Sequence, residues 1–160
     1  MFSLREIFNL AIQIERNGEQ FYRDALKKVS DASLISLLEW LANEEVKHRE
    51  WFTQKKETVK TRSEYLQVEK MGSALLQNIL GDQSFSLKEA DLSKIDRVDA
   101  LLKLAVEFEK DSILFYEMVG TFMDDEDTTG HLNEIIAEEN RHIQLLQGSQ
   151  DNVANRPCEG

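Results

Sequence analysis

The sequence predicts an all-α protein folded as one four-helix bundle. Apolar residues, 41% of the chain, recur with the period of a helix rather than with the alternation of a strand. One proline and seven glycines interrupt the 160 residues, a length that suits one domain with a sizeable core. The third observation is an internal repeat without gaps. Ala11, Glu15, Phe21, Tyr22, Glu45 and His48 recur 94 positions later as Ala105, Glu109, Phe115, Tyr116, Glu139 and His142.

The first helix is predicted from about Ser3 to Val29, with residues 30–31 as the break before the next helix. Glu15 lies within its apolar stripe. Burying a carboxylate without a partner is costly, so a metal ion explains Glu15 better than a surface position does. Gly18 follows one turn later, where glycine costs about 1 kcal/mol relative to alanine. It either leaves room beside a metal or permits close helix packing.

The second helix is predicted over about 32–62, and its apolar stripe contains Glu45 and His48. Residues three apart share a helix face, so this pair aims a carboxylate and an imidazole at one point. Both Glu44 and Glu45 recur in the second half of the chain. Because the stripe of Glu139 continues through apolar residues, we assign Glu45 and Glu139 as ligands and Glu44 and Glu138 as their outward neighbours.

Residues 63–95 have no counterpart in the repeat, so they are predicted to form a long crossover between the second and third helices. A short helix is expected within it, over about 68–80, with an apolar face that could cover the bundle or a second subunit. The predicted bundle spans 1–147, with repeat halves 3–62 and 96–147. A homodimer is the expected assembly.

The third helix is predicted over about 96–123 and carries Glu109 in its apolar stripe. Residues 124–130 are polar and are expected to form a turn and a cap. The fourth helix should follow to about Leu146. Residues 148–160 are expected to be a disordered tail.

Composition narrows the classes of partner. A net charge of −11 argues against nucleic acid. No segment approaches the roughly 20 apolar residues that cross a membrane, and no secretory signal is seen at the start. The chain has one cysteine, Cys158, so disulfides within it are impossible, and a cytoplasmic location is expected.

The candidate ligands are four carboxylates and two imidazoles without sulfur. This set suits iron or manganese and does not suit a closed tetrahedral zinc site. By the repeat symmetry, Glu45 and Glu139 are expected to bridge two metals. Tyr22 and Tyr116 lie two turns after the upstream glutamates and could donate hydrogen bonds to ligands on the facing helix, although core tyrosines would look the same. The predicted ligands are Glu15, Glu45, His48, Glu109, Glu139 and His142.

One glutamate from each of two helices, with Glu-x-x-His from each of two others, is the di-iron carboxylate pattern of ferritin-like bundles. Over residues 3–147 the sequence resembles the rubrerythrin family, whose helices read A-x-x-x-E, then an aromatic about two turns later, then E-E-x-x-H. This pattern is carried by Ala11, Glu15, Tyr22, Glu44, Glu45 and His48, and the second half repeats it.

The resemblance implies a non-haem di-iron, or di-manganese, oxidoreductase that reduces hydrogen peroxide or O₂. The sequence offers no cluster or nucleotide motif, so electrons are expected from an external donor such as rubredoxin. Rubrerythrins usually carry an additional glutamate three residues after the ligand of the third helix, and Ser112 stands there. One alternative is a ferroxidase or iron-handling protein. The other is a metal-free interaction module, and the repeated glutamates within the apolar stripes argue against this second alternative.

Overall fold

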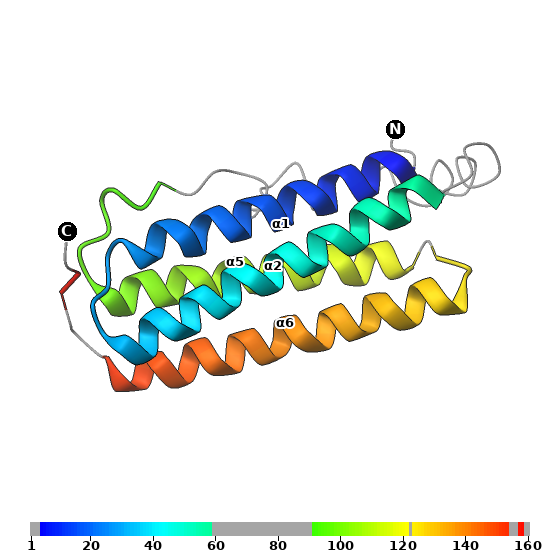
Figure 1. The fold of residues 1–160 in the computed structure, drawn as a ribbon. Coiled ribbons are helices and arrows are strands. Elements are labelled where there is room, and N and C mark those ends of the chain that lie inside the picture. The colour runs from blue at the N-terminus through cyan, green and yellow to red at the C-terminus, as the bar shows by residue number, and fades with distance from the viewer. Residues whose placement is uncertain (1–3, 59–90, 122, 154–156, 159–160) are drawn as a thin grey trace.

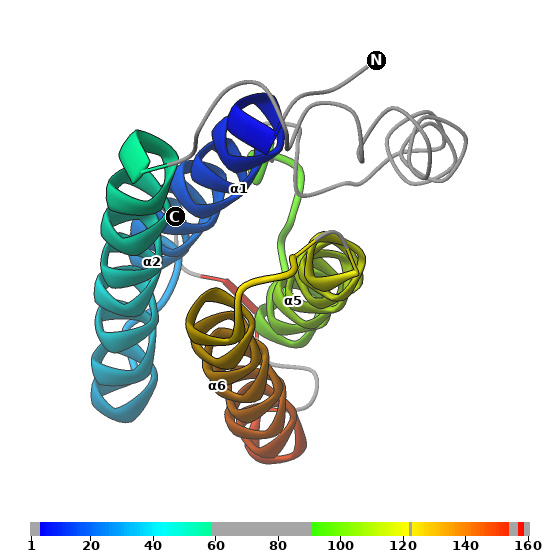
Figure 2. The same cartoon turned by 90° about the vertical axis from the view of Figure 1, so that its right-hand side faces the viewer.

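The computed structural model describes residues 4–58, 91–121, 123–153 and 157–158, and this part of the chain is an all-α four-helix bundle, as predicted (Figures 1 and 2). None of the described helices is long and apolar enough to cross a membrane. The helices are α1 (Leu4–Leu26), α2 (Ala32–Thr58), α5 (Val98–Gly120) and α6 (Glu126–Asn152).

The bundle consists of two antiparallel helix pairs. α1 packs mainly on α2, and α5 packs mainly on α6. In Figure 1, α2 and α5 run in the same direction, so α2 ends and α5 begins at opposite ends of the bundle. That arrangement agrees with the long connection expected between them. The short helix predicted over 68–80, and with it the expected dimer face, lies outside the described residues.

Aspartates begin two of the helices. Asp31 accepts a hydrogen bond from the backbone N–H of Leu34 at 3.0 Å, as the predicted break and cap require. Asp125 caps α6 by accepting from the N–H of Thr128 at 3.2 Å. An N-cap of this kind contributes about 0.5–2 kcal/mol. Because Asp125 supplies the cap, α6 begins at Glu126, within the segment that was predicted to be a turn.

The tail predicted as disordered over 148–160 is ordered where the structure describes it. α6 continues to Asn152, and Val153 is buried. The backbone N–H of Cys158 donates to the carbonyl of Asp96 at 2.7 Å, just before α5. The physical reason is apolar packing: Val153 and Cys158 both lie against the hydrophobic cluster at this end of the bundle.

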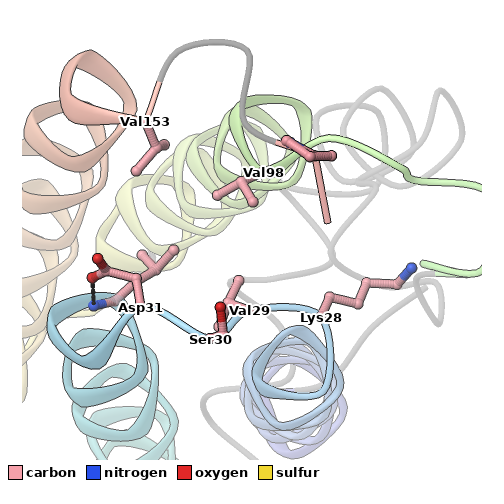
Figure 3. Close-up of a pocket in the computed structure, with 8 residues that line it drawn as sticks. Lys28, Val29, Ser30, Asp31, Val98 and Val153 are labelled. Atoms are coloured by element: carbon pink, nitrogen blue, oxygen red, sulfur yellow. Dashed lines mark hydrogen bonds between the residues drawn. The ribbon is translucent and has the colours of Figure 1, made fainter. Parts of the chain in front are cut away.

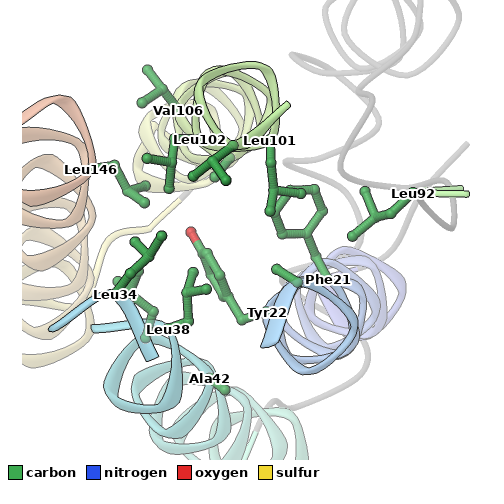
Figure 4. Close-up of a cluster of buried hydrophobic side chains, with 14 of the residues drawn as sticks. Phe21, Tyr22, Leu34, Leu38, Ala42, Leu92, Leu101, Leu102, Val106 and Leu146 are labelled. Atoms are coloured by element: carbon green, nitrogen blue, oxygen red, sulfur yellow. The ribbon is translucent and has the colours of Figure 1, made fainter. Parts of the chain in front are cut away.

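Two apolar clusters flank the middle of the bundle. One contains Tyr116 and the other Tyr22, and they fill opposite ends of the four helices. Figure 4 shows the second cluster, in which Tyr22 points from α1 into the interior between side chains of α2, α5 and α6. The clusters keep water away from the middle of the bundle, where the candidate ligands lie.

Candidate metal centre

The structure brings all six predicted ligands together. Each helix contributes from its apolar stripe, so the side chains converge on the bundle axis between the two hydrophobic clusters. None of the six is more than 3% exposed. They are Glu15 on α1, Glu45 and His48 on α2, Glu109 on α5, and Glu139 and His142 on α6.

The six residues form two overlapping groups, in each of which the candidate ligand atoms lie within 4.8 Å of one another. Both groups contain Glu45 and Glu139, the two residues that the repeat symmetry predicts as bridges. A shared carboxylate can contact two ions at once. The first group is Glu15, Glu45, His48 and Glu139, and the second is Glu45, Glu109, Glu139 and His142.

Glu139 lies between the two imidazoles and turns one oxygen toward each. Its Oε1 is 2.8 Å from Nδ1 of His48, and its Oε2 is 3.3 Å from Nδ1 of His142. The two rings are nearly parallel, with centroids 6.0 Å apart. Both Nδ1 atoms therefore face the centre of the cluster.

The cluster holds polar atoms that ordinary protein contacts leave unsatisfied. In the part of the chain that the structure describes, every buried side-chain nitrogen or oxygen without a hydrogen-bond partner belongs to one of the six residues. Each such atom costs about 1–3 kcal/mol unless something binds it. Oxygen and nitrogen donors in this number fit iron or manganese. The atoms are Glu15 Oε2, Glu45 Oε1, His48 Nδ1, Glu109 Oε2, both oxygens of Glu139, and both nitrogens of His142.

Each predicted tyrosine donates a hydrogen bond across the bundle to a candidate ligand. Tyr22 donates to Oε1 of Glu109 at 2.5 Å, and Tyr116 donates to Oε1 of Glu15. Burial, with nearby carboxylates, raises the pKa of both phenols well above its usual value, so both stay protonated. Each bond fixes one carboxylate oxygen and leaves Oε2 of the same residue unpartnered among the described residues.

The cluster concentrates negative charge in a dry environment. Burial, followed by the charges of Glu139 and Glu15, raises the pKa of Glu45 well above its usual range. For His48, burial opposes the charged form, but Glu15 and other carboxylates raise its pKa well above the usual value. Burial would also raise the pKa of Glu139, yet contacts with His142 and His48 lower it to about 2. The raised pKa values of Glu45 and His48 reflect buried carboxylates that favour bound protons or cations, whereas the lowered pKa of Glu139 reflects its two histidine partners.

Glu138 and Glu44, the outward neighbours of the candidate ligands, each form a hydrogen bond with another side chain. Glu138 is half exposed, but its Oε2 accepts a hydrogen bond from Nε2 of His48 at 2.6 Å. That bond lowers the pKa of Glu138, which stays ionised. Glu44 is buried and accepts from Nζ of Lys47 at 2.7 Å. The repeated Glu-Glu doublet was the only sequence signal for these contacts.

Gly18 provides the space that Glu45 occupies. A Cβ atom at this position would lie 2.5 Å from Oε2 of Glu45 and 3.0 Å from Cε1 of Phe108. The missing side chain therefore accommodates a ligand carboxylate. At the equivalent place on α5, the hydroxyl of Ser112 donates to the carbonyl of Phe108 at 3.0 Å, and Ser112 joins neither ligand group.

Replacing Gly18 with alanine should weaken metal binding without unfolding the bundle. The added methyl displaces the flexible end of Glu45, so we expect the affinity for Co²⁺ to fall about tenfold or more, as for other changes that misdirect a ligand. The helix itself gains about 1 kcal/mol from alanine. Calorimetric titration and thermal melting of the metal-free protein measure the two effects.

The matched control for that variant is Gly148→Ala on α6, where an added Cβ meets nothing within 4 Å. It should give the helix stabilisation with unchanged metal affinity. Equal affinity in Gly18→Ala and the unmodified protein would contradict this role for Gly18.

Two exposed or partly exposed aromatic side chains reach histidines. Trp40 is 38% exposed and packs edge-to-face on the buried His142, with ring centroids 5.3 Å apart. Trp51 stacks on His131 at 4.4 Å, with the rings nearly parallel. His131 is half exposed and joins neither ligand group. Both tryptophans are therefore anchored within this bundle.

A cavity of about 300 Å³ lies where α1 joins α2, at one end of the bundle (Figure 3). Val98 from the start of α5 and Val153 after α6 close it from the other side. None of the predicted ligands lines it. The cavity is thus separate from the carboxylate cluster. The remaining lining residues are Lys28, Val29, Ser30, Asp31, Leu34 and Pro157.

A four-helix bundle with four buried glutamates and two buried histidines, grouped around two shared carboxylates, defines a ferritin-like di-metal carboxylate protein. The sequence profile of the rubrerythrin family matches residues 6–149, and the chain belongs to that family. A crystal structure from Thermotoga maritima, described as a candidate ferritin-like diiron-carboxylate protein, is similar in fold with a TM-score of 0.71. The two share 20% sequence identity, over 94% of this chain and 95% of that one. A search of curated proteins finds no match.

Proposed function

We propose that this protein is a non-haem di-metal oxidoreductase that reduces hydrogen peroxide or O₂. The observation that supports the proposal best is the set of unsatisfied buried oxygen and nitrogen atoms, all of which belong to two ligand groups that share Glu45 and Glu139. Iron is the proposed metal, with manganese as the alternative that the same donors accept. When bound, two ferrous ions supply the two electrons that cleavage of an O–O bond requires.

The residues of the chain would hold the metals and control access to them. His48 and His142 would each bind through Nδ1, the ring nitrogen that faces the cluster. Tyr22 and Tyr116 donate hydrogen bonds to Oε1 of Glu109 and of Glu15, so that Oε2 of each glutamate is available to a metal. The apolar clusters on both sides exclude bulk water, which strengthens the electrostatic interactions within the site.

The proposal includes a separate protein as electron donor, such as rubredoxin. Reduction of one peroxide to two waters consumes two electrons and two protons, and a metal pair stores two electrons. A second turnover therefore requires electrons from outside the site. Lys55 and Lys56 at the end of α2 are candidate contacts for an acidic donor, and Nζ of Lys55 lies 3.4 Å from Oδ2 of Asp125.

Anaerobic protein loaded with ferrous iron should consume about one equivalent of peroxide per metal pair and then stop, because each pair stores two electrons. Stopped-flow absorbance with peroxide and with O₂ measures the relative rates. Adding rubredoxin, its reductase and NADH should convert the single turnover into continued peroxide consumption. The metal-deficient variant Glu45→Ala, treated identically, is the control.

Two outcomes would contradict this proposal. Faster reaction with O₂ and accumulation of ferric iron beyond two ions per chain would indicate a ferroxidase or iron-handling protein instead. Continued turnover with NADH alone would show that electrons do not enter from a separate donor protein.

A further inference from the structure

The twofold repeat is broken at the outer edge of the two imidazoles. Nε2 of His48 donates to Glu138 at 2.6 Å. By the repeat, Nε2 of His142 should have Glu44 as its partner, but this nitrogen has no hydrogen-bond partner among the described residues. His142 is fully buried, so the difference is not one of exposure to water.

Glu44 has partners other than His142, since its carboxylate lies within 4.8 Å of ligand atoms of His48 and Glu138. Lys47, one turn later on α2, holds the Glu44 carboxylate at 2.7 Å, and the position equivalent to Lys47 is Arg141. Trp40, also on α2, packs against the ring of His142. The position equivalent to Trp40 is the exposed Glu134. The two halves of the chain thus differ in the residues that surround each imidazole.

The two tyrosines do not share this asymmetry. Tyr22 and Tyr116 obey the repeat, since each donates to the upstream glutamate of the other half. Glu45 and Glu139 both belong to both ligand groups. The imidazoles and their surroundings are thus one source of difference between the two metal positions, beside the exchange of Gly18 for Ser112.

A carboxylate on the far nitrogen of a ligating histidine has a known physical effect. The hydrogen bond places the ring proton on Nε2, which leaves the Nδ1 lone pair for a metal, and it holds the ring in one orientation. It also raises the basicity of Nδ1. Removing such a partner typically costs 10–100-fold in metal affinity.

We propose that Glu138 positions His48 and thereby makes the two metal positions unequal. The position formed by Glu15, His48 and the shared glutamates binds its ion more tightly and fills first. The position formed by Glu109, His142 and the same shared glutamates fills second. This inference rests on the di-metal site proposed above, and it adds an order of loading and the residue that sets that order.

Anaerobic calorimetric titration of the full chain with Co²⁺ tests the proposal without measuring activity. The unmodified protein should bind two ions in two steps of unequal affinity. Glu138→Gln removes the charge and keeps the shape, so the tighter step should weaken about 10–100-fold while the weaker step stays unchanged. Glu50→Gln, which changes an exposed glutamate of α2, is the control and should change neither step.

Two histidine variants identify the position affected. His142→Ala should retain the tight position, and adding Glu138→Gln should weaken it by the same factor. His48→Ala should retain the weak position, and Glu138→Gln should have no effect there. The melting temperature of each metal-free variant distinguishes a change in affinity from a loss of fold.

The inference would be overturned by two equal affinities in the unmodified protein, by an equal effect of Glu50→Gln, or by an effect of Glu138→Gln in the His48→Ala background. Each of these results leaves the di-metal site intact. Binding of no ions, or of a single ion, by the unmodified protein would instead reject the proposed function and this inference with it.

Discussion

Replacing Glu45 with alanine should reduce bound metal from about two ions per chain to nearly none. Glu45 belongs to both ligand groups, so its loss removes an oxygen donor from each position at once. Glu139 is shared in the same way and lies within 3.3 Å of both imidazoles, so Glu139→Ala should have the same result. Metal analysis after loading with ferrous iron and removal of unbound ions measures the occupancy.

The control is Glu50→Ala, which removes an exposed glutamate from the same helix as Glu45. It should keep full occupancy. If Glu45→Ala or Glu139→Ala also kept two ions per chain, the proposed bridging role of that residue would be wrong. Loss of one ion alone would show that the residue serves a single position.

Removing the metals should lower the melting temperature by about 10 °C or more. A ligand present at a hundred times its Kd stabilises the fold by about 2.7 kcal/mol per site. A chain of this length changes its melting temperature by roughly 2–4 °C per kcal/mol. In addition, the buried carboxylates repel one another once the cations are gone. Thermal denaturation before and after treatment with a chelator, with metal content measured in both samples, provides the test.

Glu45→Ala is also the informative control here, because a variant that holds no metal should melt at the same temperature with or without the chelator. Glu50→Ala should respond as the unmodified protein does. An unchanged melting temperature for protein that was shown to be loaded and then stripped would contradict a buried metal site.

The ligands could be predicted because their positions follow from regular geometry. On a helix, residues three or four apart share a face, so the sequence alone predicts that Glu45 and His48 point the same way. The gapless register then placed Glu139 and His142 in the equivalent position. A glutamate inside an apolar stripe, such as Glu15, also indicated burial and hence a partner.

Helix ends and the segment after α6 were predicted less well. The polar run before α6 indicated a turn, but Asp125 caps the helix inside that run. The polar tail was expected to be disordered, yet Val153 packs in the apolar cluster to which all four helices contribute. Such contacts join residues with no regular sequence spacing, so periodicity carries no information about them.

The sequence by itself therefore determined the helical class, the six candidate ligands, and the pair of glutamates shared between two positions. The tertiary structure alone decided that Gly18 makes room for the Glu45 carboxylate, and that Glu138 rather than Glu44 contacts an imidazole. The reason is physical. Which residues share a helix face follows from the helical repeat. The partner that a side chain finds on another helix depends on all the contacts around that side chain. Glu44, for example, forms an ion pair with Lys47 of its own helix.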